Sequence, residues 1–303
     1  MSEAGWQALK LRTRGPMVEA LEDWLFDAGA VAVTLEDAAD QPLLEPGPGE
    51  TPLWDDITLV ALFPEAQPLA TVLEAVPETL LADPERAVTH VADRDWERAW
   101  MDDFHPLQMG ERLWVCPSWT SPPDPDAVNL ILDPGLAFGS GTHPTTAMCL
   151  GALDRAVLPG MSVVDYGCGS GILAIAALKL GAAAALGIDN DPQAITASDD
   201  NARRNDIPES SFEVVMPEAA SLVDWAGRAD IVVANILANP LIELAPKILA
   251  MLKPGGQLLL AGLLADQVAS VVAAYEYRLP LKVQEQQGDW VLLGGTSPEI
   301  ATP

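Results

Sequence analysis

The 303-residue chain lacks long apolar runs and has few residues that bind metals or form disulfides. No apolar stretch approaches the roughly eighteen residues that a membrane-spanning helix needs, so we expect no membrane segment. Residues 1–15 contain no long apolar block and no small-residue cleavage site. This argues against a secretory signal and favours a cytoplasmic protein.

Cysteine and histidine are both scarce, with three residues of each type. The cysteines are Cys116, Cys149 and Cys168, and the histidines are His90, His105 and His143. No two cysteines have Cys-x-x-Cys spacing, so we expect small buried thiols rather than a disulfide framework or a zinc site. The histidines share no ligand spacing either, and we expect no metal centre.

Basic residues are also scarce, because 16 Lys and Arg face 44 Asp and Glu, giving a net charge of −28. Such a surface repels phosphate backbones and argues against direct nucleic-acid binding. Residues 1–93 hold 18 acidic and 4 basic residues, so the front of the chain is the more acidic part. Two explanations stay open: a basic protein partner attracted by the field, or a saline habitat in which salt screens the charge.

The first third of the chain predicts a small α+β domain over residues 1–93. Alternating apolar residues predict four strands, and helical spacing predicts two helices. The strands are expected at 5–13, 31–37, 57–63 and 87–93, and the helices at 17–30 and 68–80. The order strand–helix–strand–strand–helix–strand is typical of a ferredoxin-like sandwich.

A short linker helix is predicted over residues 94–107, where Pro106 interrupts the pattern. Trp96 and Trp100 lie four residues apart and therefore on one face of this helix. They either pack against a neighbouring domain or form an exposed patch for a partner.

Residues 108–303 predict a second domain in which strand and helix patterns alternate from residue 145 onward. The expected architecture is an open, mostly parallel Rossmann-like sheet covered on both faces by helices. A strand pair around Gly288 is expected to add an antiparallel edge. One long helix is predicted over residues 240–256, closed by proline and glycine.

The segment VVDYGCGSGIL, residues 163–173, carries most of the chemical information. Gly167, Gly169 and Gly171 fall between a predicted strand and a predicted helix, where a ligand can approach the backbone closely. Asp165 closes that strand; its carboxylate repels a dinucleotide pyrophosphate but attracts a cationic amino acid. The GxGxG spacing also differs from the GxGxxG that NAD-binding proteins use.

Two further polar residues follow later strands. Asp189 ends the next strand, where an acid typically accepts both hydroxyls of an adenosine ribose. Together with Asp165 this predicts a ligand with an adenosine, a sulfonium and an amino group, which is S-adenosylmethionine. Asn235 ends another strand and could hold an amine near the sulfonium methyl; the alternative is a turn-forming asparagine.

Four segments in this order resemble the PrmA-type methyltransferases, and the similarity is nearly continuous from residue 95 to 265. They are LDPGLAFGSGTHPTT at 132–146, DYGCGSGILAIAALKLGA at 165–182, GIDNDPQAI at 187–195 and ANILANPL at 234–241. The resemblance implies a seven-stranded class I methyltransferase domain that uses S-adenosylmethionine. It also implies a substrate, the basic ribosomal protein L11, whose lysine and N-terminal amines are methylated repeatedly.

The resemblance implies that the 132–146 loop and the helix after it cover the cofactor. By the same likeness, the cofactor contacts are Thr146, Gly167, Asp189 and Asn235. Their place in the motifs adds Asp165, Gly169 and Thr145 as expected cofactor-binding residues, and Asn235 is the expected catalytic residue.

Several alternatives stay open at this point. His143 could act as a general base, or it could bond within its own rigid loop. The substrate could be another protein or a small molecule, and an NAD-dependent oxidoreductase or a non-catalytic adaptor would explain parts of the pattern. A phosphate-binding loop is disfavoured, because GSGTHPTT lacks the lysine of the P-loop motif.

Overall fold

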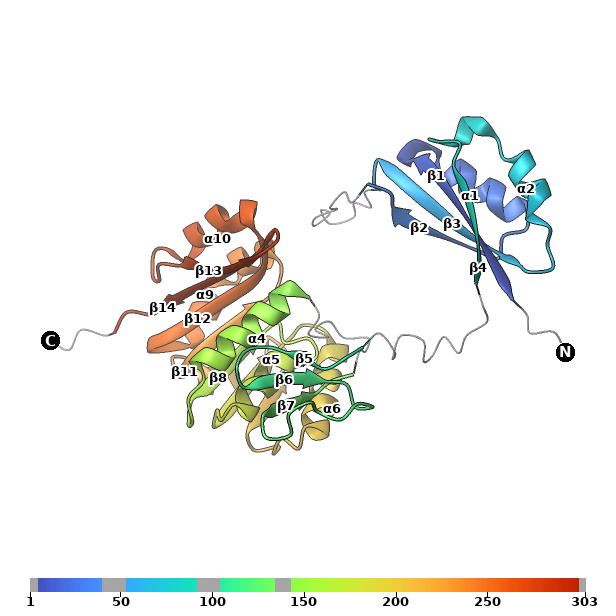
Figure 1. Cartoon of the computed structure of the whole chain (residues 1–303). Helices are drawn as coiled ribbons and strands as arrows, with labels where there is room; N and C mark the ends of the chain where they lie inside the picture. Colours follow the sequence, from blue (N-terminus) through green and yellow to red (C-terminus); the bar gives the residue numbers. More distant parts are fainter. Residues whose placement is uncertain (1–4, 40–52, 92–103, 134–142, 300–303) are drawn as a thin grey trace. The chain divides into compact units, whose positions relative to one another are not determined.

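The computed structural model describes residues 5–39, 53–91, 104–133 and 143–299. The chain divides into two compact units, residues 1–103 and 104–303 (Figure 1). Most of the predicted linker helix, with Trp96 and Trp100, lies outside the described residues, and residues 104–106 form no helix. Within the described ranges, no helix is long and apolar enough to cross a membrane.

The first unit is a four-stranded antiparallel sheet with two helices. Its elements are β1 Trp6–Arg14, α1 Val18–Asp27, β2 Ala32–Asp37, β3 Asp56–Pro64, α2 Leu69–Ala75 and β4 Arg86–Val91, with short 3-10 turns at Gly15–Met17 and Glu78–Leu80. The strand order is β2-β3-β1-β4. This order and the chain connectivity confirm the predicted ferredoxin-like sandwich.

Strand alternation places the core of this first unit on one side of its sheet. Leu9 and Leu11 of β1 and Leu59 of β3 are fully buried. They pack in one cluster with Leu21 and Leu25, which lie four residues apart on α1. Each such side chain contributes roughly 1.5–3 kcal/mol when it leaves water. The spacing of apolar residues along the strands and α1 therefore accounts for the core of this unit.

The second unit begins with a small three-stranded sheet that packs on α4. The strands are β5 Leu107–Gln108, β6 Leu113–Cys116 and β7 Val128–Ile131, and β6 and β7 run parallel. The Asp154 carboxylate of α4 accepts hydrogen bonds from the Glu111 N–H at 2.7 Å and from Arg112 Nε at 3.1 Å. The strand β5 was not predicted, because two residues leave no pattern to detect.

The main sheet of the second unit has seven strands in the order β10-β9-β8-β11-β12-β14-β13. They are β8 Ser162–Tyr166, β9 Ala184–Ile188, β10 Phe212–Val215, β11 Ala229–Asn235, β12 Leu252–Leu264, β13 Lys282–Gln287 and β14 Trp290–Thr296. β14 runs antiparallel to both of its neighbours, β12 and β13, whereas the ladders among β10, β9, β8, β11 and β12 are parallel. The predicted Rossmann-like sheet with an antiparallel edge is confirmed.

Helices cover both faces of this sheet (Figure 1). They are α4 Pro144–Ala156, α5 Ile172–Lys179, α6 Pro192–Arg204, α7 Leu222–Trp225, α8 Ala238–Glu243, α9 Ala245–Met251 and α10 Val268–Tyr275. The prediction of one helix over 240–256 was wrong: it is two helices that meet at Leu244, followed by β12. Pro246 has no N–H to donate and fits the first turn of a new helix, so it breaks the longer one.

Two apolar clusters fill the space between the seven-stranded sheet and its helices. On β11, Ile231 and Val233 belong to one cluster and Val232 and Ala234 to the other. Successive side chains on a strand point to opposite faces, so an uninterrupted apolar strand serves both layers. Both cores hold the carboxyl ends of β8, β9 and β11 at one edge of the sheet, where ligands bind in open α/β folds.

Candidate active site

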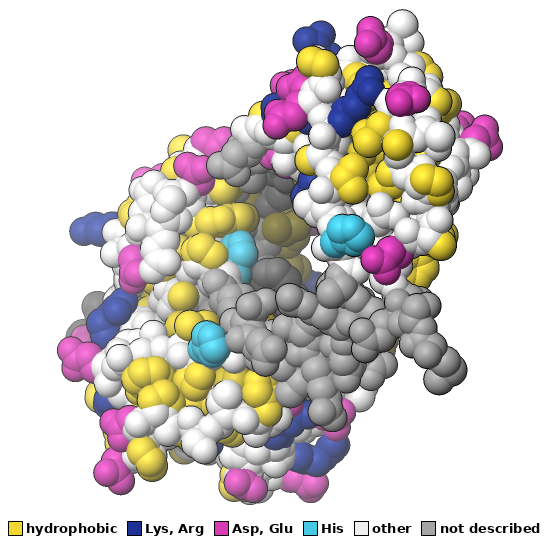
Figure 2. All heavy atoms as spheres, turned by 45° about the vertical axis from the view of Figure 1, so that its right-hand side comes forward, with side chains coloured by type: hydrophobic (Ala, Val, Ile, Leu, Met, Phe, Trp, Pro, Cys, Tyr) yellow, Lys and Arg dark blue, Asp and Glu magenta, His cyan; other side chains and the backbone are white. Residues whose placement is uncertain are grey.

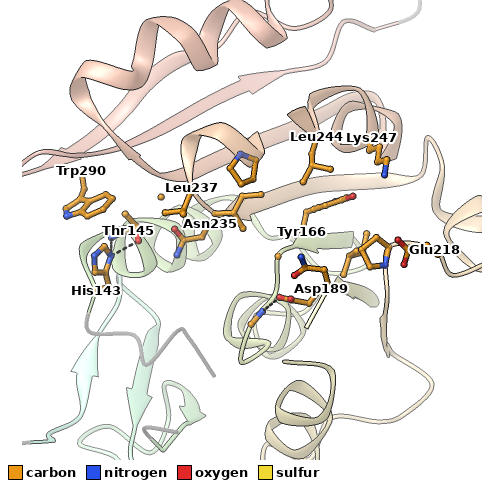
Figure 3. A pocket seen from close by; sticks show the side chains of 18 residues that line it. His143, Thr145, Tyr166, Asp189, Glu218, Asn235, Leu237, Leu244, Lys247 and Trp290 are labelled. Atoms are coloured by element: carbon orange, nitrogen blue, oxygen red, sulfur yellow. Dashed lines mark hydrogen bonds between the residues drawn. The ribbon is translucent and has the colours of Figure 1, made fainter. Parts of the chain in front are cut away.

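A pocket of about 750 Å³ opens at the carboxyl ends of β8, β9 and β11 (Figure 3). Its volume is in the range of pockets that hold a small-molecule ligand. His143, Thr145, Asn235, Leu237 and Trp290 line one end. Tyr166, Asp189, Glu218, Leu244 and Lys247 line the other.

The glycine loop after β8 forms the floor of the pocket. Gly167, Gly169 and Gly171 have φ angles of 80°, 54° and 76°, which only glycine adopts without strain. A Cβ on Gly167 would lie 2.2 Å from Ile236 Cγ2. The Ser198 hydroxyl donates to the Gly169 carbonyl at 3.0 Å, which fixes the loop to α6. The loop therefore presents backbone, with no side chain between it and a ligand.

Asp189 stands beside this loop at the tip of β9 and lines the pocket. Its Oδ2 accepts the Gly169 N–H at 2.8 Å, and its Oδ1 accepts the Asp191 N–H at 3.0 Å. These two bonds fix the orientation of the carboxylate. Each oxygen keeps a lone pair that can accept a further hydrogen bond from a ligand hydroxyl.

Asp165 lies beneath the loop and does not line the pocket. It is fully buried; its Oδ2 accepts the Ala174 N–H at 3.2 Å, and its Oδ1 has no partner among the described residues. The pKa of this carboxyl is raised to about 7, mainly by burial and to a smaller extent by the charge of Asp189, against the opposing effect of the Ala174 hydrogen bond. Asp165 is thus a buried carboxyl group whose Oδ1 could still accept a hydrogen bond or interact with a cation.

The first turn of α4 faces the glycine loop across the pocket. His143 caps this helix: its Nδ1 accepts the Thr145 N–H at 3.3 Å and lies 2.7 Å from Thr145 Oγ1. Burial lowers the pKa of His143, so its ring is neutral at pH 7. The capping geometry favours the structural alternative for His143, because its Nδ1 is occupied by its own helix.

Asn235 joins two elements that are far apart in the sequence. It ends β11, and its Nδ2 donates to Thr146 Oγ1 of α4 at 3.2 Å. This bond leaves the amide oxygen of Asn235 as the acceptor that it can offer at the pocket. Thr146 itself is fully buried, so it acts on the pocket through Asn235.

The structure brings the predicted residues together at one end of one sheet. Five of them line the pocket: Thr145, Gly167, Gly169, Asp189 and Asn235. The other two, Thr146 and Asp165, lie directly behind that surface. The predicted small buried thiols are confirmed, since Cys116, Cys149 and Cys168 are free and buried.

Sequence reasoning missed several residues of the pocket, of which Trp290 is the most informative. Its ring lies against His143 with the centroids 4.7 Å apart and the planes at 73°. Tyr166 and Lys247 were also missed. A tryptophan directly after the turn at Gly288 is a weak signal, because only the reversed course of β14 brings it to this edge.

The fold and the pocket define the class of protein. A glycine loop after β8, an acid at the tip of β9 and a reversed strand next to the sheet edge are the features of class I methyltransferases. Residues 5–297 match the family model described as ribosomal protein L11 methyltransferase, PrmA. The chain therefore belongs to this family, which confirms the resemblance noted in the sequence.

Relatives match the chain along nearly its whole length. A ribosomal protein L11 methyltransferase from Marinobacter nauticus is 50% identical over 295 residues, covering 96% of this chain and 98% of the relative. One from Serratia proteamaculans is 52% identical over 294 residues, covering 96% and 98%. The crystal structure of ribosomal protein L11 methylase from Lactobacillus delbrueckii subsp. bulgaricus shares 33% identity with a TM-score of 0.56, covering 65% of this chain and all of that one.

Proposed function

We propose that this protein transfers methyl groups from S-adenosylmethionine to amines of ribosomal protein L11. The observation that supports this best is the shared pocket. Asp189 lies toward one end of it and Asn235 toward the other, so a nucleoside and an amine fit side by side. The chain belongs to the ribosomal protein L11 methyltransferase family, whose name states the same activity.

The residues of the pocket fit S-adenosylmethionine. Asp189 offers lone pairs to ribose hydroxyls, and Gly167 and Gly169 present their backbone to the pocket that they line. The unpartnered Oδ1 of Asp165 lies behind the loop, where a positively charged ligand would stabilise its ionised form. When bound, the cofactor supplies a methyl group on a positively charged sulfur.

The chain's own residues contribute alignment and a suitable electrostatic environment. A lysine amine with pKa near 10.4 is protonated at pH 7, and freeing its lone pair costs roughly 4–5 kcal/mol. The positive charge of the cofactor's sulfur lowers the pKa of the amine and therefore lowers that cost. Burial lowers the pKa of His143, which favours its neutral ring, and a neutral ring does not repel the cationic sulfur or the charged amine. Asn235 then acts as the catalytic residue: its amide oxygen accepts an N–H of the amine and aims the lone pair at the methyl group.

We further propose that lysine side chains and the N-terminal amine of L11 are both targets, and that each receives up to three methyl groups. In this proposal residues 1–93 recognise the substrate, residues 94–107 link the domains, and residues 108–303 catalyse the transfer. The front of the chain has 18 acidic and 4 basic residues, which attract a basic ribosomal protein rather than RNA. Acidic side chains are spread over the face in Figure 2. A ribosomal substrate places the enzyme in the cytoplasm.

The experiment that tests this function uses the full-length protein, unmethylated L11 and S-adenosylmethionine. Mass spectrometry of L11 should show added mass in steps of one methyl group, and peptide mapping identifies the amines. Asn235→Ala should lower the rate by about a hundredfold, as expected for loss of an aligning hydrogen bond. Asn239→Ala is the matched control, because Asn239 is exposed and lies outside the pocket lining. Unmodified L11 after reaction with the wild-type protein would refute the proposal.

A further inference from the structure

We call the part of the pocket lined by Asn235, His143 and Trp290 its amine end. This end has one hydrogen-bond acceptor and two aromatic side chains. Asn235 offers its amide oxygen there, and Trp290 and His143 lie against each other beside it (Figure 3). Trp290 is half-buried and packs on the apolar core, so its position is well defined. Both rings are uncharged at pH 7, because burial lowers the pKa of His143.

Each methyl transfer reduces the number of N–H groups that the amine can donate to the residues at this end of the pocket. A primary amine has two N–H groups, a monomethylated amine has one, and a dimethylated amine has none. Asn235 can therefore orient the amine through a hydrogen bond in the first and second transfers. In the third transfer the attacking neutral amine has no N–H, so apolar contacts orient the nitrogen, and a cation–π contact stabilises the positive charge that develops on it as the bond forms.

We propose that Trp290 orients the methylated amine and thereby determines how many methyl groups the enzyme adds. This inference rests on the proposed amine methyltransferase function. In each transfer a new C–N bond forms as the C–S bond of the donor breaks, and its electron pair stays on the sulfur. The nitrogen releases a proton to water before each of the three transfers, and the third yields a quaternary ammonium with no proton to lose.

The placement of Trp290 suits this role better than that of the other pocket residues. An indole is the strongest partner for a methylated ammonium among aromatic side chains, because its ring face carries negative charge density. Thr145 is occupied by its bonds with His143, and Leu237 offers apolar surface without that charge density. Trp290 thus provides an orienting contact for the dimethylated amine, which has no N–H left to donate to Asn235.

The test measures single methyl transfers on L11 by the full-length protein. Unmethylated, monomethylated and dimethylated species are resolved by mass spectrometry over time for the wild type, Trp290→Leu and Trp290→Phe. For Trp290→Leu we expect the third transfer to slow about tenfold and the dimethylated product to accumulate, with the first transfer changed less than threefold. Trp290→Phe should restore part of the third transfer, because it keeps an aromatic face.

Two controls separate this role from a structural one. Trp225→Leu changes another half-buried tryptophan, which lies in α7 and outside the pocket lining, and should leave the product distribution unchanged. Asn235→Ala should show the reverse pattern, with the first transfer slowed more than the third. Equal slowing of all three transfers in Trp290→Leu, or an unchanged product distribution, would overturn the inference. If the wild-type protein adds no methyl group to L11, the proposed function fails, and this inference fails with it.

Discussion

The buried carboxyl of Asp165 predicts a specific dependence of stability on pH. Burial raises its pKa from the ordinary value of 3.8 to about 7, and its Oδ1 has no partner among the described residues. Between these two values the folded chain holds a proton that the unfolded chain has lost. The contribution of Asp165 to the free energy of unfolding therefore falls as pH rises through this window and is level on either side of it.

The size of the effect follows from the width of the window. One pKa unit corresponds to 1.36 kcal/mol, so a shift of about three units amounts to roughly 4 kcal/mol. Asp165→Asn cannot ionise and removes this contribution. The variant should gain stability relative to the wild type from about pH 4 upward, and the difference should level off near pH 8.

Urea denaturation of the full-length wild type and Asp165→Asn at several pH values measures this difference. The other acidic groups are common to both proteins and cancel in the comparison. A stability difference between the two proteins that is the same at every pH would reflect the hydrogen bonds of the introduced amide. The prediction concerns only the part of the difference that changes with pH. Asp189→Asn should shift the midpoint of the wild-type pH dependence downward, because it removes the charge that adds to the shift. A stability difference that does not change between pH 5 and 8 would refute the reasoning.

Three further predictions concern the cofactor and the substrate. Gly167→Ala should weaken S-adenosylmethionine binding by tenfold or more in calorimetry, because its Cβ would meet Ile236 Cγ2 and its φ is 80°. Gly160→Ala, with φ 89° but no neighbour within 4 Å, should affect stability alone; equal binding losses in both variants would contradict this explanation. Asp189→Ala should likewise weaken binding about a hundredfold, since two ribose hydrogen bonds to a charged group are lost; unchanged affinity would remove Asp189 from the cofactor site. The kcat/KM for L11 should fall about tenfold between roughly 0.05 and 0.5 M salt if the acidic surface steers the substrate, whereas a flat profile would leave only the saline-habitat explanation.

Much of this fold is local and could therefore be predicted. The alternation along β1 and β3 and the helical spacing of Leu21 and Leu25 depend on neighbours within a few residues. The glycine loop is also local, because the φ angle of Gly167 depends on that residue having no Cβ. These features made the two-domain α/β architecture and the cofactor loop accessible from the sequence.

Local pattern failed where a single residue or a short contact overrode it. The apolar spacing over 240–256 continues through Leu244, yet Pro246 begins a new helix there. The two-residue strand β5 is defined by its pairing with β6 rather than by its own sequence. The effect of Pro246 is local but was outweighed by the apolar spacing around it, whereas the pairing of β5 lies outside its own two residues.

By itself the sequence determined most of the elements, the glycine loop and the acids near the ends of β8 and β9, because each depends on residues close along the chain. Only the tertiary structure decided how they work together. It buried Asp165, bonded Asn235 to Thr146 across 89 residues, and set Trp290 against His143. The order of the strands in the sheet, with β14 reversed beside β12, brings these distant segments to one edge, and no local pattern encodes that order.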